Sequence, residues 1–364
     1  MTKQFYYMKQ AIRCAEKARG NCSPNPFVGA VIVKDETIIA RGWTQSYGSD
    51  HAEIHALKQA GAQANGADMY VTLEPCSHYG KTPPCALAVI AAGIKRVFIG
   101  ITDPNPLVSG KGIKLLTEAS IEVQSGLFAE EITRQLEYFL CYIQQQRPFV
   151  TLKTALTLDG KYAAQDGSSR WISGEKARLY THKLRSQYDV ILTGIKTIMR
   201  DDPLLTARLP GKPKQPLRVV LDPALKLPVD SQFARSMQEF SSLVFCSCGI
   251  ENSAKFLKLK DMGAILVGLP IDKGHFCIND VLAHLASLNK YSVLLETGSG
   301  LAEAFLQARL VDKCLFFYGA KILGGSHSPL PNLGIANIQQ AISLTNLELK
   351  QLGDTILLSA YPVW

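Results

Sequence analysis

The chain has 364 residues, of which 47% are hydrophobic and 19% are charged, and it carries a formal net charge of +8. This composition excludes an intrinsically disordered protein, the lack of any run of roughly 18 apolar residues excludes a membrane-spanning one, and the length favours two domains. The basic residues are scattered rather than gathered in one tract, so their charge fits a phosphorylated metabolite and a phosphate-bearing cofactor at least as well as nucleic acid.

The first twenty residues are typical of an amphipathic helix. They lack the apolar region and the small-residue cleavage site of a secretory signal, so we expect a cytosolic protein. Nine cysteines, an odd number in a chain without such a signal, make disulfides improbable. Most of these cysteines should be small buried hydrophobic side chains.

Strands and helices alternate through the rest of the N-terminal part. A turn at Ser23–Pro26 precedes two strands that flank the polar sequence Lys34–Thr37. Further strands are predicted at residues 69–76, 96–104 and the end of 112–123, and helices at residues 51–61, 83–93 and the start of 112–123. This alternation predicts a layered sheet covered by helices.

A helix predicted over residues 130–148 marks the domain boundary. Its apolar periodicity ends at Gln144–Gln146, and it stops before Pro148. We therefore place the boundary at residue 146, with one domain over residues 1–146 and a second over residues 147–364. The alternative, an ordinary surface helix within one large domain, stays open.

The C-terminal part contains a second series of strands and helices. Short strands rich in valine, isoleucine and leucine are separated by helices, which predicts a doubly wound, mostly parallel sheet. The strands are predicted at residues 149–163, 189–194, 216–222, 241–249, 263–268, 291–300 and 313–319, with helices at residues 175–187 and on each side of 291–300.

The strongest chemical signal lies between residues 51 and 85. His51 opens a helix, Cys76 ends a strand, and Cys85 follows nine residues later. One imidazole and two thiolates suit Zn²⁺, and three protein ligands leave the fourth tetrahedral position to water, as in a catalytic site. Zinc lowers the pKa of that water, and Glu53 can carry its proton to a leaving nitrogen. The set predicts hydrolytic deamination and matches the His-x-Glu … Pro-Cys pattern of zinc nucleobase deaminases.

Two alternatives to a catalytic zinc site stay open at this point. His51 could be a surface histidine at a helix start, and the two cysteines could be core thiols. A structural zinc would need a fourth ligand, for which His78 is the candidate, but Glu53 would then have no task. His55 suggests a His-Glu-x-x-His motif, but the glutamate is misplaced in it, so we expect a structural role for His55.

The N-terminal part resembles the deaminases of the riboflavin pathway. Its eight residues between the cysteines depart from the usual Pro-Cys-x-x-Cys, yet this long spacing is itself similar to the motif of those enzymes. The similar segments are Thr72–Cys85 (TLEPCSHYGKTPPC), Asn25–Ala30 and Asp103–Gly112. The resemblance implies a cytidine-deaminase-like three-layer α/β domain in which Asn25, His78 and Lys81 contact the pyrimidine and its ribose phosphate. The other interpretations are a turn asparagine, an exposed loop histidine and a solvated lysine.

A strand, a glycine turn and a helix start follow one another at Val293–Phe305 (VLLETGSGLAEAF) in the C-terminal part. Such a turn offers free backbone N–H groups and the positive end of a helix to a phosphate. Glu303 occupies the position of the last glycine in a Gly-x-Gly-x-x-Gly motif, so an ordinary connection between strand and helix is an equal alternative.

The C-terminal part also resembles the reductase of the riboflavin pathway, a relative of dihydrofolate reductase that uses NADPH. The similar segments are residues 149–174, 191–208, 218–222 and 294–300. The resemblance implies a dihydrofolate-reductase-like α/β domain. Over the whole chain, it implies a bifunctional riboflavin biosynthesis enzyme. Such an enzyme deaminates a phosphoribosylated diaminopyrimidinone with zinc and then reduces its ribosyl group to ribityl with NADPH.

The same resemblance assigns individual site residues. It implies NADPH binding by Ala155, Trp171, Thr197, Asp201, Gly298, Ser299, Gly300, Leu301, Ala302, Glu303 and Ala304. It implies substrate binding by Ser169, Arg185, Leu205, Arg208 and Glu296, and Lys153 and Glu296 are expected on strands near the reacting carbon. Arginine suits a phosphate because its guanidinium presents paired donors.

Each assignment has a structural alternative. Either arginine could belong to a surface ion pair, and Lys153 could lie on a solvent-facing strand. Trp171 could be a core residue, and Asp201 could cap a helix or turn. The expected partners are a small phosphorylated pyrimidine and further copies of the chain, with no nucleic acid and no membrane. Two rival functions stay open: an RNA-directed base deaminase, and a non-enzymatic zinc module joined to a nucleotide-sensing domain.

Overall fold

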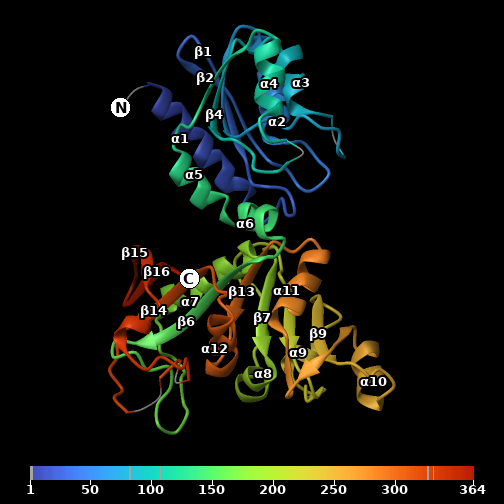
Figure 1. Ribbon diagram of the computed structural model, residues 1–364, viewed down its shortest axis with the longest axis vertical. Helices are drawn as coiled ribbons and strands as arrows, with labels where there is room; N and C mark the ends of the chain where they lie inside the picture. Colours follow the sequence, from blue (N-terminus) through green and yellow to red (C-terminus); the bar gives the residue numbers. More distant parts are fainter. Residues whose placement is uncertain (1–2, 82, 107, 326–327, 331) are drawn as a thin grey trace. The chain divides into compact units, whose positions relative to one another are not determined.

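The structure is a computed structural model that describes residues 3–81, 83–106, 108–325, 328–330 and 332–364. The chain divides into two units, Met1–Gln146 and Arg147–Trp364, here called unit 1 and unit 2 (Figure 1). Thr82 and Leu107, which belong to the segments similar to deaminases, lie outside the described residues. In the part of the chain that the structure describes, no helix is long and apolar enough to cross a membrane.

Unit 1 is built on a five-stranded mixed sheet. The strands lie in the order β2-β1-β3-β4-β5, with β1 antiparallel to both of its neighbours and β3, β4 and β5 parallel to one another. The strands are β1 (Gly29–Lys34), β2 (Thr37–Trp43), β3 (Asp68–Leu73), β4 (Arg96–Ile101) and β5 (Glu122–Ser125). The parallel strands β3 and β4 are buried almost throughout, which explains their continuous apolar sequences.

Helices cover both faces of this sheet. The helices are α1 (Lys3–Ala15), α2 (Ala52–Ala60), α3 (Cys85–Ala91), α4 (Lys111–Glu118), α5 (Ala129–Gln135) and α6 (Glu137–Gln145). A Cβ on Gly29 would lie 2.0 Å from the Ala11 carbonyl oxygen of α1, and a Cβ on Gly42 would lie 2.0 Å from the Ala52 carbonyl oxygen of α2. Gly29 pairs with Trp43, the residue after Gly42, so the two glycines face opposite sides. Helices α1 and α2 therefore pack closely on opposite faces, and the expected three-layer architecture is confirmed.

The helix expected over residues 130–148 is instead two helices. Helix α5 ends at Gln135, α6 begins at Glu137, and Leu136 between them has a φ of −97° and a ψ of 15°. Leu136 is fully buried. The prediction of one continuous helix was wrong because apolar periodicity continues across the break and conceals it.

Unit 2 is built on a nine-stranded sheet in the order β10-β9-β8-β7-β13-β6-β14-β16-β15. The chain runs outward from β7 to β10 and then returns to insert β13 between β7 and β6. The strands are β6 (Phe149–Thr157), β7 (Val190–Gly194), β8 (Leu217–Leu221), β9 (Ser242–Ser247), β10 (Ile265–Leu269), β13 (Ser292–Glu296), β14 (Lys313–Gly319), β15 (Leu344–Leu352) and β16 (Thr355–Pro362). The first seven strands in this order, which end with β14, are parallel to one another, and this confirms the expected mostly parallel sheet.

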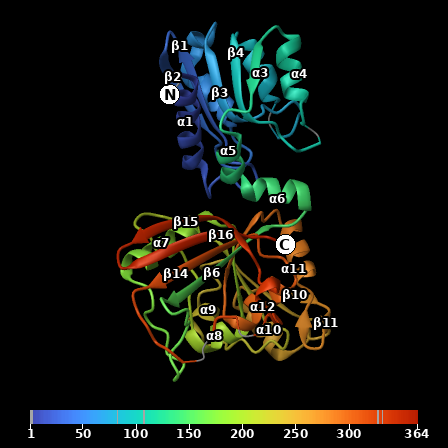
Figure 2. The ribbon, with the colours of Figure 1, turned by 60° about the vertical axis from the view of Figure 1, so that its left-hand side comes forward.

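The C-terminal hairpin was not predicted from the sequence. Strand β16 pairs antiparallel with β14, and β15 pairs antiparallel with β16 and forms one edge of the sheet, as Figure 2 shows. A separate short hairpin joins β11 (Ile271–Asp272) to β12 (His275–Phe276). Strand β15 is exposed along most of its length, so its sequence carries little of the apolar signal that marks the buried strands.

Helices surround the sheet of unit 2. They are α7 (Glu175–Gln187), α8 (Ile195–Asp201), α9 (Gln232–Arg235), α10 (Ala254–Asp261), α11 (Ile278–Ser287) and α12 (Ser299–Gln307). Apolar side chains of α11 and α12, such as Leu285 and Phe305, pack with the central strands into one buried core. Helices α8 and α12 directly follow β7 and β13, so both begin at the carboxyl edge of the parallel strands.

Candidate functional sites

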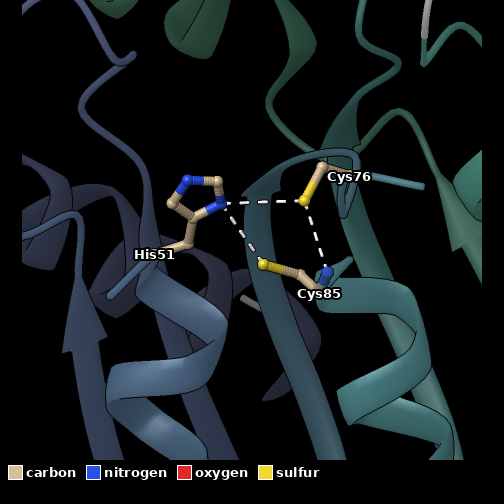
Figure 3. A group of neighbouring side chains, drawn as sticks. All are labelled: His51, Cys76 and Cys85. Atoms are coloured by element: carbon tan, nitrogen blue, oxygen red, sulfur yellow. Dashed lines mark hydrogen bonds between the residues drawn. The ribbon is translucent and has the colours of Figure 1, made fainter. Parts of the chain in front are cut away.

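Three side chains that could hold a metal ion, here called the metal-binding group, meet at one edge of the sheet in unit 1. His51 directly precedes α2, Cys76 follows β3, and Cys85 is the first residue of α3 (Figure 3). The His51 Nδ1 atom lies 3.7 Å from the Cys76 Sγ atom and 3.3 Å from the Cys85 Sγ atom. All three ligand atoms lie within 4.8 Å of one another.

These distances fit one zinc ion. Bonds of about 2.3 Å to sulfur and 2.1 Å to nitrogen, at a tetrahedral angle, place the two ligand atoms about 3.6 Å apart. The imidazole-to-sulfur distances lie close to this value without any rearrangement. Among the described residues, this group of mutually close donors contains three members, and His78 is not one of them. The arrangement therefore favours a three-ligand site over a four-ligand structural one.

The protonation states of the three side chains are linked to one another. A hydrogen bond from the Cys85 thiol lowers the pKa of Cys76 to about 4, and the same contact raises the pKa of Cys85. The hydrogen bond with Cys76 raises the pKa of His51. The two sulfurs therefore share one proton, and a metal ion that bonded to both of them would displace that proton.

Glu53 lies in the first turn of α2 beside this group. Its side chain is buried, and burial, followed by the charge of Cys76, raises its pKa to about 7. A hydrogen bond links the Glu53 carboxylate to the Cys85 thiol. A carboxyl group with a pKa near neutrality can both accept and return a proton at physiological pH.

His55 has the structural role expected from the sequence. Its Nδ1 atom lies 3.0 Å from the Gln45 side-chain amide and 3.4 Å from the Trp43 backbone nitrogen. Its ring packs edge to face against the Trp43 ring. The ring therefore joins α2 to β2.

The residues expected to contact the pyrimidine lie on loops of unit 1. Asn25 lies in the turn before β1, where its carbonyl oxygen accepts a hydrogen bond from the Cys22 thiol. His78 follows Cys76, and its Nδ1 atom is buried without a hydrogen-bond partner. The exposed Lys81 places its ammonium group 4.1 Å from the centre of the Tyr47 ring. A buried nitrogen without a partner is a group that a ligand could satisfy.

Asp103 is a buried carboxylate near the metal-binding group that the sequence analysis did not single out. It follows β4, and burial raises its pKa to about 6, with contributions from Glu74 and Cys76 and an opposing one from His78. The available signal was its place at the end of a buried strand, within the segment 103–112 already noted as similar to deaminases.

In unit 2, three of the expected substrate-binding residues form an ionic cluster. Arg185 of α7 donates to both carboxylate oxygens of Glu296, over 2.7 and 3.0 Å, and the Lys153 Nζ atom lies 3.8 Å from the same carboxylate. Glu296 ends β13 and pairs in register with Lys153 of β6. Burial alone would raise the pKa of Glu296, but Arg185 and Lys153 lower it to about 2. Burial lowers the pKa of Lys153.

Arg208 extends this cluster towards solvent, and His182 joins it. Thr206 links Arg208 and His182 to the cluster. Its carbonyl oxygen accepts a hydrogen bond from Arg185, and its hydroxyl oxygen accepts one from Arg208. The His182 Nδ1 atom lies 3.2 Å from the same oxygen and 3.3 Å from the Arg208 backbone nitrogen. Burial, then Arg185 and Arg208, lower the pKa of His182. His182 was missed in the sequence, although it precedes Arg185 by three residues and so shares its helix face. Leu205 in the same segment is buried.

The residues expected to bind NADPH lie around the carboxyl ends of three adjacent parallel strands. Residues 298–304 form the cap and first turns of α12 after β13. Thr197 and Asp201 belong to α8 after β7, and Ala155 lies in β6, which the loop with Ser169 and the exposed Trp171 follows. Strands β7, β13 and β6 are neighbours, and ligands of open parallel sheets bind at this edge.

Two of the residues expected to bind NADPH have buried side chains. Ala302 and Glu303 are buried, and the Glu303 carboxylate accepts a hydrogen bond of 2.8 Å from the Asn332 backbone nitrogen. Their side chains thus support α12 itself. In contrast, Gly298 and Gly300 are exposed, and a Cβ on either would meet no atom within 4 Å. The open side of the turn is therefore formed by the glycines.

Known proteins resemble both halves of the chain. A family model described as "Cytidine and deoxycytidylate deaminase zinc-binding region" matches residues 1–101, and one described as "RibD C-terminal domain" matches residues 148–358. A curated "Riboflavin biosynthesis protein RibD" from Bacillus amyloliquefaciens is 41% identical, over 98% of this chain and 96% of its own length. The protein of the same name from Aquifex aeolicus is 40% identical, over 97% of this chain and 96% of its own length.

Solved structures resemble the whole chain as well. Acinetobacter baumannii RibD, form 1, has a TM-score of 0.88 at 36% identity and covers 100% of this chain and 99% of its own. A Thermotoga maritima protein has a TM-score of 0.86 at 34% identity, with 99% of each chain covered. Its title describes a diaminohydroxyphosphoribosylaminopyrimidine deaminase/5-amino-6-(5-phosphoribosylamino)uracil reductase.

Proposed function

This chain belongs to the RibD family of bifunctional riboflavin biosynthesis enzymes, and from that premise we propose that its two units divide the two reactions between them. Unit 1, residues 1–146, is the zinc-dependent deaminase domain, and unit 2, residues 147–364, is the NADPH-dependent reductase domain. The first reaction removes an amino group from 2,5-diamino-6-(5-phosphoribosylamino)pyrimidin-4(3H)-one by hydrolysis, and the second reduces the ribosyl group to ribityl. The single observation that carries the proposal is the convergence of His51, Cys76 and Cys85 beside Glu53.

In the deaminase site, the three ligands would hold zinc, which supplies an activated water when bound. Glu53 would hold a proton on its carboxylate and pass it to the departing nitrogen. Its buried position and its hydrogen bond with the Cys85 thiol support this task, because they fix the carboxylate beside the three ligands. Asn25, His78 and Lys81 orient the pyrimidine and the ribose phosphate.

In the reductase site, NADPH supplies the reducing equivalents when bound. The exposed glycine turn that begins α12, together with Ala155, Trp171, Thr197 and Asp201, would hold the cofactor. Arg208 and Arg185 orient the phosphorylated substrate with Ser169 and Leu205. Glu296, at the end of β13, and Lys153, its neighbour in the middle of β6, lie beside the reacting carbon. The support for this arrangement is the cluster itself, in which one carboxylate faces two arginines and a lysine.

The two rival functions are not retained. Both the RNA-directed base deaminase and the non-enzymatic zinc module are inconsistent with relatives named for riboflavin biosynthesis that match almost the entire chain.

Purified protein should be incubated with the phosphoribosyl diaminopyrimidinone, first without and then with NADPH. Ammonia should appear without cofactor, and loss of NADPH absorbance should follow only after deamination. An absence of ammonia release from the zinc-loaded protein would defeat the assignment of unit 1. Ammonia release without subsequent NADPH oxidation would defeat that of unit 2.

We further infer that the enzyme acts in the cytoplasm as a homo-oligomer. The chain has an odd number of cysteines, nine, which suits a reducing compartment. Strand β15 is the edge of the large sheet and exposes Leu347 and Leu349, at 60% and 74% exposure. Exposed apolar edge strands are suited to association. Sedimentation of the wild type and of Leu349→Lys tests this inference, and a monomeric wild type would refute it.

A further inference from the structure

Glu74 is a buried carboxylate, 3% exposed, that accepts four backbone hydrogen bonds. One carboxylate oxygen accepts from Asp103 over 3.2 Å and from Gly110 over 3.0 Å. The other accepts from Gly112 over 3.0 Å and from Ile113 over 3.1 Å. All four donors come from the loop after β4 and the start of α4, whereas Glu74 itself follows β3.

The same two segments pack closely through Gly112. A Cβ on Gly112 would lie only 2.1 Å from the Pro75 carbonyl oxygen and 3.2 Å from the Glu74 carboxylate. The start of α4 therefore rests directly on the turn that carries Cys76. The close approach leaves no room for a side chain at Gly112. It also brings the backbone N–H groups of this segment to the Glu74 carboxylate, which accepts hydrogen bonds from them.

This contact determines where Asp103 lies. The Asp103 carboxylate interacts with the charges of Cys76 and His78, and it also accepts a hydrogen bond of 2.9 Å from the Asn105 backbone nitrogen. Since the Asp103 backbone nitrogen is one of the four donors to Glu74, the position of this aspartate beside the site depends on Glu74.

We propose that Glu74 is a positioning residue of the deaminase: its carboxylate holds residues 103–106 and 108–113 against the Pro75–Cys76 turn and thereby fixes the wall of the pyrimidine site that carries Asp103. This inference rests on the proposed deaminase function of unit 1. Glu74 touches neither substrate nor metal in it. Its effect is transmitted through the loop, so substrate binding depends on it more than the chemical step does.

Glu74→Gln in the full-length, zinc-loaded chain tests the proposal. The amide nitrogen of the glutamine would face two backbone N–H donors, which would then lack an acceptor. The loop would be held less firmly, and we expect substrate binding to weaken by about 10-fold or more. We expect the deaminase KM to rise on this order, with kcat within a few-fold of the wild type. Zinc content and reductase activity should be unchanged, and amide hydrogen exchange at residues 103, 110, 112 and 113 should accelerate. Glu118→Gln, an exposed glutamate on α4, is the matched control and should behave as the wild type.

The outcomes separate the inference from the function beneath it. A wild type without deaminase activity would refute the proposed function itself. An active wild type with an unchanged KM in Glu74→Gln would overturn the positioning role, and so would a loss of zinc in that variant. If the glutamine variant does not accumulate, Glu74→Asp keeps the charge on a shorter side chain. An intermediate rise in KM would support the proposal, and a wild-type KM would overturn it.

Discussion

Burial gives Glu53 a chemical character that an exposed glutamate lacks. Burial away from solvent disfavours its charged form, and the neighbouring Cys76 adds to this effect, so its pKa rises to about 7. A proton carrier works best when its pKa lies near the working pH, because it must be able to gain and lose the proton in one cycle. The position of Glu53 in the first turn of α2, two residues after His51, fixes it beside the metal-binding group.

Glu53→Gln should abolish deamination and little else. The amide keeps the size of the side chain but cannot carry a proton, so kcat should fall roughly 10²- to 10⁴-fold. Zinc content, measured by metal analysis, and NADPH-dependent reduction of pre-deaminated substrate should match the wild type. The exposed Glu122→Gln is the control. Retained deamination in Glu53→Gln would refute the role assigned to this carboxylate.

Glu296 should make the stability of unit 2 depend on pH. Arg185 and Lys153 outweigh the effect of burial and lower its pKa from 4.5 to about 2. A carboxylate with a lowered pKa stabilises the folded state above its unfolded pKa, and this stability is lost as the pH falls through the folded value. The contribution is roughly 3 kcal/mol at neutral pH and should disappear between about pH 4.5 and pH 2.

The measurement compares the wild type with Glu296→Gln. Hydrogen exchange of amides in β6 and β13 reports unit 2 alone, so acid effects on the metal ligands of unit 1 do not interfere. The wild type should be the more stable protein at pH 7, and the difference should narrow as the pH approaches 3. A difference that stays constant with pH would contradict the proposed ionic contribution.

At the scale of elements, Arg218 joins β8 to its neighbours. Its side chain is fully buried, and burial lowers its pKa to about 10. It donates to the carbonyl oxygens of Leu204, Ser236 and Phe240 and to two serine hydroxyls. The guanidinium therefore ties the central sheet both to the end of α9 and to the loop that continues to Leu205 and Arg208.

Arg218→Met should destabilise unit 2 by roughly 3 kcal/mol, because three partly buried carbonyl groups lose a charged donor. The loosened loop should also lower reductase activity, while deamination stays unchanged. Hydrogen exchange of the β8 amides measures the stability of unit 2, and assays of reduction and deamination measure the two activities. Arg235→Met on α9, whose side chain is exposed, is the control. If both variants are equally stable, the bonds made by Arg218 contribute no net stability.

The parts of the fold and site that the sequence predicted are those with local signals. The metal-binding group follows from short motifs at a helix start and a strand end, and the buried parallel strands follow from their apolar runs. The contacts that were missed join distant segments. Glu74 meets donors 29 to 39 residues away, and Arg185 meets Glu296 across 111 residues. No local pattern encodes such pairs, because the fold alone brings them together.

At the scale of the whole molecule, each unit contains its own sheet and core, so each should fold and function alone. Residues 1–146 should deaminate, and residues 147–364 should reduce the deaminated substrate with NADPH. The cut must precede Arg147, whose guanidinium forms two bonds of 2.7 Å with Asp312, and Asp312 also accepts from the Val150 backbone nitrogen. These contacts anchor β6, which lies between β13 and β14 in the sheet.

A fragment that begins at Thr151 provides the matched test. It lacks Arg147 and the first two residues of β6, Phe149 and Val150, so it should be insoluble or markedly less stable than the fragment that begins at Arg147. Circular dichroism and the two activity assays compare the fragments with the intact chain. Removal of zinc from the intact chain by a chelator should likewise abolish deamination and spare reduction. If reduction is lost together with zinc, the two activities depend on each other. The same conclusion follows if neither residues 1–146 nor residues 147–364 are active alone, and in either case the division proposed between the units is wrong.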